Sequence, residues 1–250
     1  MLELLQATFL DPRFPALALA ALVAGLVRGF SGFGAAMIFV PVAAALYSPQ
    51  HAVVLLFIAD GVVTLPLVLR ALKFCAWREV APLAVGATLA YPAGVKLLLI
   101  VDPVPMRWAI SLLVLGLVGL LTSGWRYGRR PNAPGTLAVG GLAGLAGGST
   151  GIAGPPIVLF WLAGQGMAPT VRANIMVFFG ITTVVGGVLY FLAGLFTGPR
   201  AVGSLALIPV YTLAIYAGAH AFGLASERLY RRLALGLCAL AALVGLPLWS

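Results

Sequence analysis

Charged residues, histidines and cysteines are all scarce in this sequence. Only 8% of its 250 residues are Asp, Glu, Lys or Arg, and only six are acidic, whereas roughly a quarter of the residues in an average soluble domain are charged. So few charges could not cover the surface of a water-soluble fold of this length. The two histidines and two cysteines form no CxxC or Cys/His pair, so we expect no metal and no cofactor.

Two kinds of motif are also missing. The chain has no HExxH, paired-Asp or Ser/His pattern of the kind that a membrane-embedded enzyme would need, so we do not expect an enzyme. Residues Met1–Asp11 include Glu3 but no Lys or Arg, so the basic start of a secretory signal is absent. We therefore expect the first hydrophobic stretch to be retained.

Long neutral hydrophobic runs dominate what is present. No charged residue occurs in Pro131–Val171, Ala173–Pro199 or Ala201–Ser226, and about 20 apolar residues suffice for a membrane-spanning helix. Because these runs do not alternate as barrel strands do, they favour helices. The sequence predicts an all-α integral membrane protein. Its net charge of +9 then reflects basic residues at helix ends, which orient the chain in the bilayer, rather than binding to nucleic acid.

Eight segments are expected to lie in the membrane, and two of them are too long for one helix. Both long segments contain glycine clusters near the middle, at Gly29–Gly34 and Gly147–Gly151. We expect each to be two half-helices or a re-entrant hairpin. The eight segments are 14–47, 50–70, 79–101, 106–126, 134–167, 171–195, 201–222 and 229–249.

The two halves of the chain resemble each other. Gly29 and Gly148 are 119 residues apart, Arg78 and Arg200 are 122 apart, and the long broken segment opens each half. We therefore predict a first membrane repeat over 1–130 and a second over 131–250. Repeats with glycine- or proline-interrupted segments at matching positions are typical of secondary transporters.

The distribution of arginine and lysine predicts how the repeats lie. If the loop with Arg70, Lys73 and Arg78 is cytoplasmic, most other basic clusters reach the same side only when segment 134–167 enters and returns as a hairpin. Each half then has an odd number of crossings, so the halves would be inverted copies. Arg200 is the exception, because it would lie outside.

The broken segments are the candidate binding sites. The start of a half-helix offers unpaired N–H groups and the positive end of the helix dipole, which suit an anion. Ser31, Ser149 and Thr150 would add hydroxyl donors, and two breaks meeting in the membrane would form one site between the halves. The alternative is that the glycines allow close helix packing, since Gly140, Gly144 and Gly148 have GxxxG spacing.

Two motifs resemble a known family. The sequence Gly148-Ser149-Thr150-Gly151-Ile152-Ala153-Gly154-Pro155-Pro156, followed by Arg172-Ala173-Asn174, resembles the second-half signature of the TauE/SafE sulfite exporter family, also called the toluene sulfonate uptake permease family. Arg28-Gly29-Phe30-Ser31-Gly32-Phe33-Gly34 resembles its first-half motif, although Ala35 and Ala36 stand where the family often has further glycines. The resemblance implies transport of small sulfur-containing anions across the bacterial inner membrane, driven by protons.

We expect the substrate site to combine these motifs with nearby polar residues. Arg28 would pair with the anion or extend to the membrane interface. Arg172 would contact substrate or anchor its helix in headgroups, and Asn174 would donate to the anion or join two helices. The full expected set is Arg28, Gly29, Ser31, Gly32, Gly34, Gly148, Ser149, Thr150, Gly151, Gly154, Pro155, Arg172 and Asn174.

Asp60 is the candidate for proton coupling. It lies about ten residues into segment 50–70, and an ionisable group at that depth is a functional hypothesis by default. It would carry the coupling proton or form a static salt bridge with Arg28. An alternating-access anion transporter is thus the first hypothesis, and a channel for small anions or solutes is the alternative. The expected partners are a small anion and the lipid bilayer, and a homodimer is left open.

Overall fold

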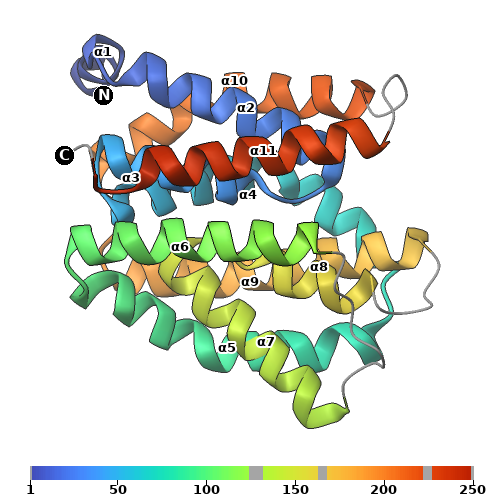
Figure 1. Ribbon diagram of the computed structural model, residues 1–250. Helices are drawn as coiled ribbons and strands as arrows, with labels where there is room; N and C mark the ends of the chain where they lie inside the picture. Colours follow the sequence, from blue (N-terminus) through green and yellow to red (C-terminus); the bar gives the residue numbers. More distant parts are fainter. Residues whose placement is uncertain (1, 124–131, 163–167, 222–226, 249–250) are drawn as a thin grey trace. The chain divides into compact units, whose positions relative to one another are not determined.

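The computed structural model describes residues 2–123, 132–162, 168–221 and 227–248, and this part of the chain contains helices and no strands. Figure 1 shows their arrangement along the chain. The helices are α1 (Leu2–Leu10), α2 (Phe14–Ser31), α3 (Ala35–Leu46), α4 (Pro49–Ala71), α5 (Trp77–Ile100), α6 (Pro103–Thr122), α7 (Ala133–Thr150), α8 (Gly154–Leu162), α9 (Ala168–Leu192), α10 (Gly198–Ala221) and α11 (Glu227–Gly245).

Five of these helices, α4, α5, α6, α9 and α10, are long and apolar enough to cross a membrane. Three shorter apolar stretches lie in α2, α3 and α11. Many large apolar side chains are exposed along the long helices, such as Leu89 at 76% and Leu213 at 71%, which suits contact with lipid rather than water. The expectation of a helical, multi-pass membrane protein is confirmed at this level.

The expected segments agree with the helices to within a few residues, with two differences. α1 was not expected, because nine residues are too few to register as a membrane segment. The segment expected at 229–249 corresponds to α11, which begins at Glu227 and is apolar only from Arg232 to Gly245. The two long segments are broken as expected: α2 and α3 replace the first, and α7 and α8 replace the second.

The helices form two compact units, and each unit draws on both halves of the sequence. Unit 1 contains Met1–Asp60, Val101–Ser123 and Leu195–Ser250; unit 2 contains Gly61–Ile100 and Gly124–Gly194. Helix α4 contributes its first part to unit 1 and its last part to unit 2. The predicted repeats, 1–130 and 131–250, describe a duplication in the sequence, so they need not coincide with the two compact units. They stay a prediction.

In unit 2, α7 packs closely against α5 through glycines (Figure 1). A Cβ added at Gly148 would lie 2.5 Å from the Tyr91 carbonyl oxygen, and one added at Gly144 would lie even closer to the Ala87 carbonyl oxygen. Because both partner positions advance by four residues, the two helices run parallel. Only residues without a Cβ let two backbones approach this closely.

Unit 1 contains the same arrangement between α2 and α10. A Cβ added at Gly29 would meet the Ile215 carbonyl oxygen, and one added at Gly25 would meet the Tyr211 carbonyl oxygen. Each contact corresponds to one in unit 2 when α2 positions are raised by 119 and α10 positions are lowered by 124. These two helices therefore also run parallel.

The broken segment of unit 2 is a hairpin. α7 follows α5 away from Trp77 as far as Tyr91, roughly 21 Å along α5 at about 1.5 Å per residue. After the break, α8 brings Trp161 back to Glu79, in the first turn of α5, where the indole Nε1 donates to Glu79 Oε2 at 3.1 Å. Both ends of the α7–α8 hairpin thus lie at the Trp77 end of α5, and the distance of roughly 21 Å along α5 is shorter than the thickness of a bilayer core, about 30 Å.

The broken segment of unit 1 also returns to where it began. The Tyr47 hydroxyl donates to Asp11 Oδ2 at 2.8 Å, and the Arg13 guanidinium donates to the Leu46 carbonyl oxygen at 3.2 Å. A hydrogen bond from the Arg13 backbone N–H holds the pKa of Asp11 below its usual value, and burial together with the bond to Asp11 raises the pKa of Tyr47 to about 12. These contacts tie the end of α3 to the start of α2.

Candidate anion sites at the two helix breaks

The first break depends on two glycines in the left-handed region. α2 ends with the Gly32 N–H bonded to the Arg28 carbonyl oxygen at 2.7 Å, with φ of 78° at Gly32 and 94° at Gly34. Other L-residues rarely adopt such angles. Ser31 is the last residue of α2, and its side chain lies outside the described part of the structure.

The start of α3 keeps its donors available. The Met37 N–H bonds to the Gly34 carbonyl oxygen at 3.1 Å. Within the described residues, the backbone N–H groups of Ala35 and Ala36 donate no hydrogen bond to the protein. The first turn of α3 contains no acidic residue, so the positive end of its dipole is not neutralised there.

Arg28 and Asp60 form an ion pair beside this break. Arg28 Nε lies 2.5 Å from Asp60 Oδ1, and the side chains are only 14% and 23% exposed. The Tyr211 hydroxyl, fully buried on α10, donates to the same oxygen at 2.7 Å. The salt bridge weighed for Asp60 is therefore present, and it joins α2, α4 and α10 within unit 1. Two half-buried charges away from water stabilise a structure only while both remain paired.

The second break has a similar backbone but fewer donors. α7 ends with Gly151 at φ 71°. The hydroxyls expected to face an anion bond to their own helix instead: Ser149 donates to the Leu145 carbonyl oxygen and Thr150 to the Ala146 carbonyl oxygen, each at 2.8 Å. Thr150 Oγ1 also accepts from the Ile152 N–H at 3.3 Å.

The first turn of α8 is poor in N–H groups because of its sequence. α8 begins Gly154-Pro155-Pro156, and proline has no backbone N–H. Two of the four N–H groups that a helix start normally leaves unpaired are thus missing. Gly154 and Pro155 do lie at the break as expected, but the dipole of α8 would act on an anion with fewer direct hydrogen bonds than that of α3.

Two tyrosines support the end of α7 in unit 2. The Tyr190 hydroxyl, fully buried on α9, lies 3.1 Å from the carbonyl oxygens of both Gly147 and Gly148 and donates to them. Tyr91 packs edge-on against it, with ring centroids 6.1 Å apart. The Gly147 carbonyl oxygen also accepts from the Gly151 N–H at 2.9 Å. Because the last carbonyls of a helix lack some of the partners that interior carbonyls have, Tyr190 stabilises the point at which α7 stops.

Gly29 and Gly148 lie in helix–helix contacts. Each faces a carbonyl of the neighbouring helix, Ile215 and Tyr91 respectively, at a distance that leaves no room for a Cβ. The packing role considered for these glycines is thus observed. Their contact with substrate stays a prediction.

Arg172 and Asn174 lie near the open end of the unit 2 hairpin, separated from the Gly151 break by the length of α8, roughly 13 Å. Arg172 is exposed. Asn174 is fully buried: its Oδ1 accepts from the Ala76 N–H at 2.7 Å, and its Nδ2 donates to Glu79 Oε2 at 3.0 Å. The helix–helix role weighed for Asn174 is present in this geometry.

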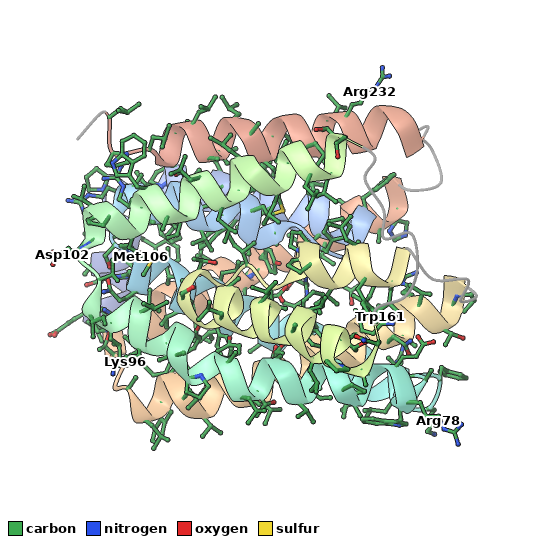
Figure 2. All side chains as sticks on the ribbon, turned by 60° about the horizontal axis from the view of Figure 1, so that its bottom comes forward. Arg78, Lys96, Asp102, Met106, Trp161 and Arg232 are labelled. Carbon is green, nitrogen blue, oxygen red and sulfur yellow. The ribbon has the colours of Figure 1, made fainter. Side chains whose placement is uncertain are left out.

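Glu79 is the centre of that network. It accepts from both Trp161 and Asn174, and so joins the first turn of α5 to α8 and α9. Figure 2 shows Trp161 at the same end of unit 2 as Arg78, which follows Trp77 at the start of α5. The network therefore holds the end of α8 to the starts of α5 and α9.

Replacing Asn174 with alanine should destabilise unit 2 markedly. The Ala76 N–H would lose its acceptor and Glu79 would lose a donor, and each unsatisfied buried group costs about 1–3 kcal/mol. We expect a clear fall in Tm of the detergent-purified protein, measured by size-exclusion after heating. Thr122→Ala is the matched control, since that exposed hydroxyl donates only to carbonyls of its own helix. Equal Tm values for the two variants would contradict the role assigned to Asn174.

Three residues of these sites were not expected from the sequence: Glu79, Tyr190 and Tyr211. Glu79 could have been noticed because it is one of only six acidic residues and begins a hydrophobic segment. The tyrosines could have been noticed because a buried phenol in an apolar helix usually requires a hydrogen-bond partner. The hydrogen-bond partners of the two tyrosines could not have been identified from the sequence, because they lie between 42 and 151 residues away.

Comparison with known proteins agrees with these features. Neither the curated proteins nor the solved structures include a significant match to the chain. The family model described as "Sulfite exporter TauE/SafE" matches residues 17–244, which include both helix breaks and all helices from α3 to α10. The chain therefore belongs to the TauE/SafE sulfite exporter family.

Proposed function

We propose that this protein is a secondary transporter that moves a small sulfur-containing anion, such as sulfite, a sulfonate or a sulfoacetate-like compound, across the bacterial inner membrane by alternating access. The observation that carries the proposal is the first helix break. There, two free N–H groups at the start of α3 lie in the same unit as an arginine paired to a carboxylate. Family membership supports transport of a sulfur-containing anion.

Arg28 is the proposed substrate-binding cation. A guanidinium can hold a sulfonate or sulfite through two parallel hydrogen bonds, and Arg28 follows α2 to the edge of the break, four residues before Gly32. An incoming anion would compete with Asp60 for this guanidinium. Gly32, Gly34 and the N–H groups of Ala35 and Ala36 would complete the contacts to the anion, because the backbone is closely approachable there.

Asp60 is the proposed proton carrier. When the anion takes its place on Arg28, Asp60 loses its cation in surroundings that do not favour an unpaired charge. Taking up one proton neutralises the carboxyl group, and Tyr211 can still donate to it. One anion and one proton would then be bound together, and release of the anion would return Arg28 to Asp60 and expel the proton.

The second break lacks this pair of charges. The positions 119 residues after Arg28 and Asp60 are Gly147 and Phe179. We propose that the second break, with Gly151, Gly154 and Pro155, contributes a helix dipole and shape, whereas coupling resides in unit 1. Ser31, Ser149, Thr150, Arg172 and Asn174 remain proposed members of the wider substrate path.

The proposed architecture is two inverted repeats of five helices. Support comes from the matching α2–α10 and α7–α5 contacts and from helix starts that differ by 119 residues between α2 and α7 and by 121 between α5 and α10. Helix α4 begins two residues after Tyr47, where the first hairpin closes, and ends just before α5, where the second hairpin closes. We propose that the two repeats are inverted in the membrane because the distribution of Arg and Lys along the sequence favours an odd number of crossings in each half.

Flux into proteoliposomes tests this function against the channel alternative. We expect uptake of sulfite, sulfoacetate, taurine or thiosulfate to saturate with concentration and to reverse direction when the pH gradient is reversed. A carrier must also exchange labelled for unlabelled anion across the membrane. Flux that neither saturates nor responds to the gradient would indicate a channel, and the absence of flux for every sulfur-containing anion, with simple carboxylates transported, would contradict the substrate class.

A further inference from the structure

A second basic site lies in unit 2, and its lining includes no residue of the helix break in that unit. The end of α4 and the start of α9 form an open groove of about 760 Å³. It includes two arginines from different helices, Arg70 and Arg172, and the hydroxyl of Thr170. The remaining lining residues are Leu67, Ala71, Phe74, Pro169, Ala173 and Met176.

The charge of the groove is strongly positive. Arg70 and Arg172 are exposed, and within the described residues neither forms an ion pair with a carboxylate. Lys73 and Arg78 follow Arg70 closely in the sequence. The one acidic residue between Arg70 and Ile100 is Glu79, whose Oε2 already accepts from Trp161 and Asn174. Glu79 is thus hydrogen-bonded to α8 and α9 and, within the described residues, forms no ion pair with Arg70 or Arg172, so both guanidinium groups can bind an anion.

The apolar lining indicates what kind of anion fits. Phe74 is 71% exposed and Leu67 is 41% exposed, and both line the groove with Met176. A small hydrophilic anion would contact the arginines but not these apolar side chains. An amphiphile can contact the arginines with its charged group and the apolar side chains with its hydrocarbon part. The groove also lies where α4 ends and α9 begins, and the half-exposed Trp77 follows the lining residue Phe74 by three positions. Tryptophan and arginine at the ends of spanning helices are typical of the membrane–water interface.

We propose that this groove binds an anionic phospholipid. The phosphodiester would lie between Arg70 and Arg172, with Thr170 as a further donor, and an acyl chain would lie along Leu67, Phe74 and Met176. Basic pockets between helices on the cytoplasmic side of a membrane commonly hold anionic headgroups, and the basic residues here favour that side. Because the lipid would join α4 to α9, it would stabilise unit 2.

Thermal stability in detergent tests this proposal independently of transport. Phosphatidylglycerol added to the purified protein should raise Tm by about 4 °C, whereas phosphatidylcholine with the same acyl chains should not. Arg70→Ala/Arg172→Ala should lose the shift. Lys96→Ala is the matched control and should keep it, because Lys96 is also an exposed cation but lies at the opposite end of α5 from Arg78 (Figure 2).

Native mass spectrometry gives a second measurement that does not depend on stability. The wild-type protein should retain one more phosphatidylglycerol than the double variant at equal lipid concentration. Equal retention, or an equal Tm shift in the double variant, would overturn the proposal. A shift produced by millimolar glycerol 3-phosphate or sulfite alone, and lost in the double variant, would assign the groove to a free oxyanion instead.

Discussion

Replacing Gly148 with alanine should separate α7 from α5 and sharply reduce the amount of folded protein. The added Cβ would lie 2.5 Å from the Tyr91 carbonyl oxygen and 3.0 Å from the Val95 backbone nitrogen. Backbone atoms cannot rotate away as a side chain can, so the helices must move apart along their whole contact. Overpacking a well-packed site usually costs about 1–3 kcal/mol, and we expect the upper end here, with leucine abolishing folding.

The same substitution at Gly29 should have at least the same effect in unit 1, because the Ile215 carbonyl lies even closer. Fluorescence-detected size-exclusion after heating would measure Tm for both variants. Gly116→Ala is the control, since a Cβ at this exposed position of α6 meets no atom within 4 Å. If Gly148→Ala and Gly116→Ala have the same Tm, α7 and α5 do not pack as described.

Substitutions at Arg28 and at Asp60 should affect different steps: the first should affect anion binding, and the second should affect proton coupling. Arg28→Gln removes the proposed anion-binding cation and should abolish flux. Asp60→Asn removes the proposed proton carrier but keeps a hydrogen-bonding side chain of the same shape. We therefore expect this variant to exchange labelled for unlabelled anion while losing its response to a pH gradient. Counterflow and gradient-driven uptake in the same proteoliposomes would distinguish the two results.

The thermal stability of the single and double variants tests whether Arg28 and Asp60 stabilise the fold as an ion pair. Removing one partner of a buried pair costs about 3–5 kcal/mol, whereas replacing both costs much less. Arg28→Gln/Asp60→Asn should thus be more stable than either single variant. Tyr211→Phe is the matched control, because it removes only the hydrogen bond to Asp60 and should keep gradient-driven transport. An Asp60→Asn variant that still responds to the pH gradient would rule out Asp60 as the carrier.

The helix breaks could be predicted from the sequence, because their cause is local. Gly32, Gly34 and Gly151 adopt positive φ angles that other residues avoid, so glycine clusters in a long apolar segment indicate an interruption. The Arg28–Asp60 pair could be proposed for a similar reason. Both charges lie in otherwise neutral surroundings, and such charges usually pair with each other.

The partners of the glycines and of the buried polar groups could not be predicted. The glycine spacing in 140–148 suggests close packing but does not specify α5 as the partner. Ser149 and Thr150 were expected to face an anion, yet a hydroxyl in a helix can donate to a carbonyl three or four residues earlier, and both do so. The Glu79–Trp161–Asn174 network joins residues 82 and 95 positions apart, a separation that no local pattern reveals.

The pairing of α2 with α10 has a consequence for biosynthesis. Translation finishes α2 about 190 residues before α10 is complete, which is roughly 10–40 s at ordinary elongation rates. All of Gly61–Gly194 is translated before α10 begins, so α5 already exists when its neighbour α7 is made. The α5–α7 contact of unit 2 can therefore form first during translation. The glycines of α2 have no α10 to pack against until translation is nearly complete.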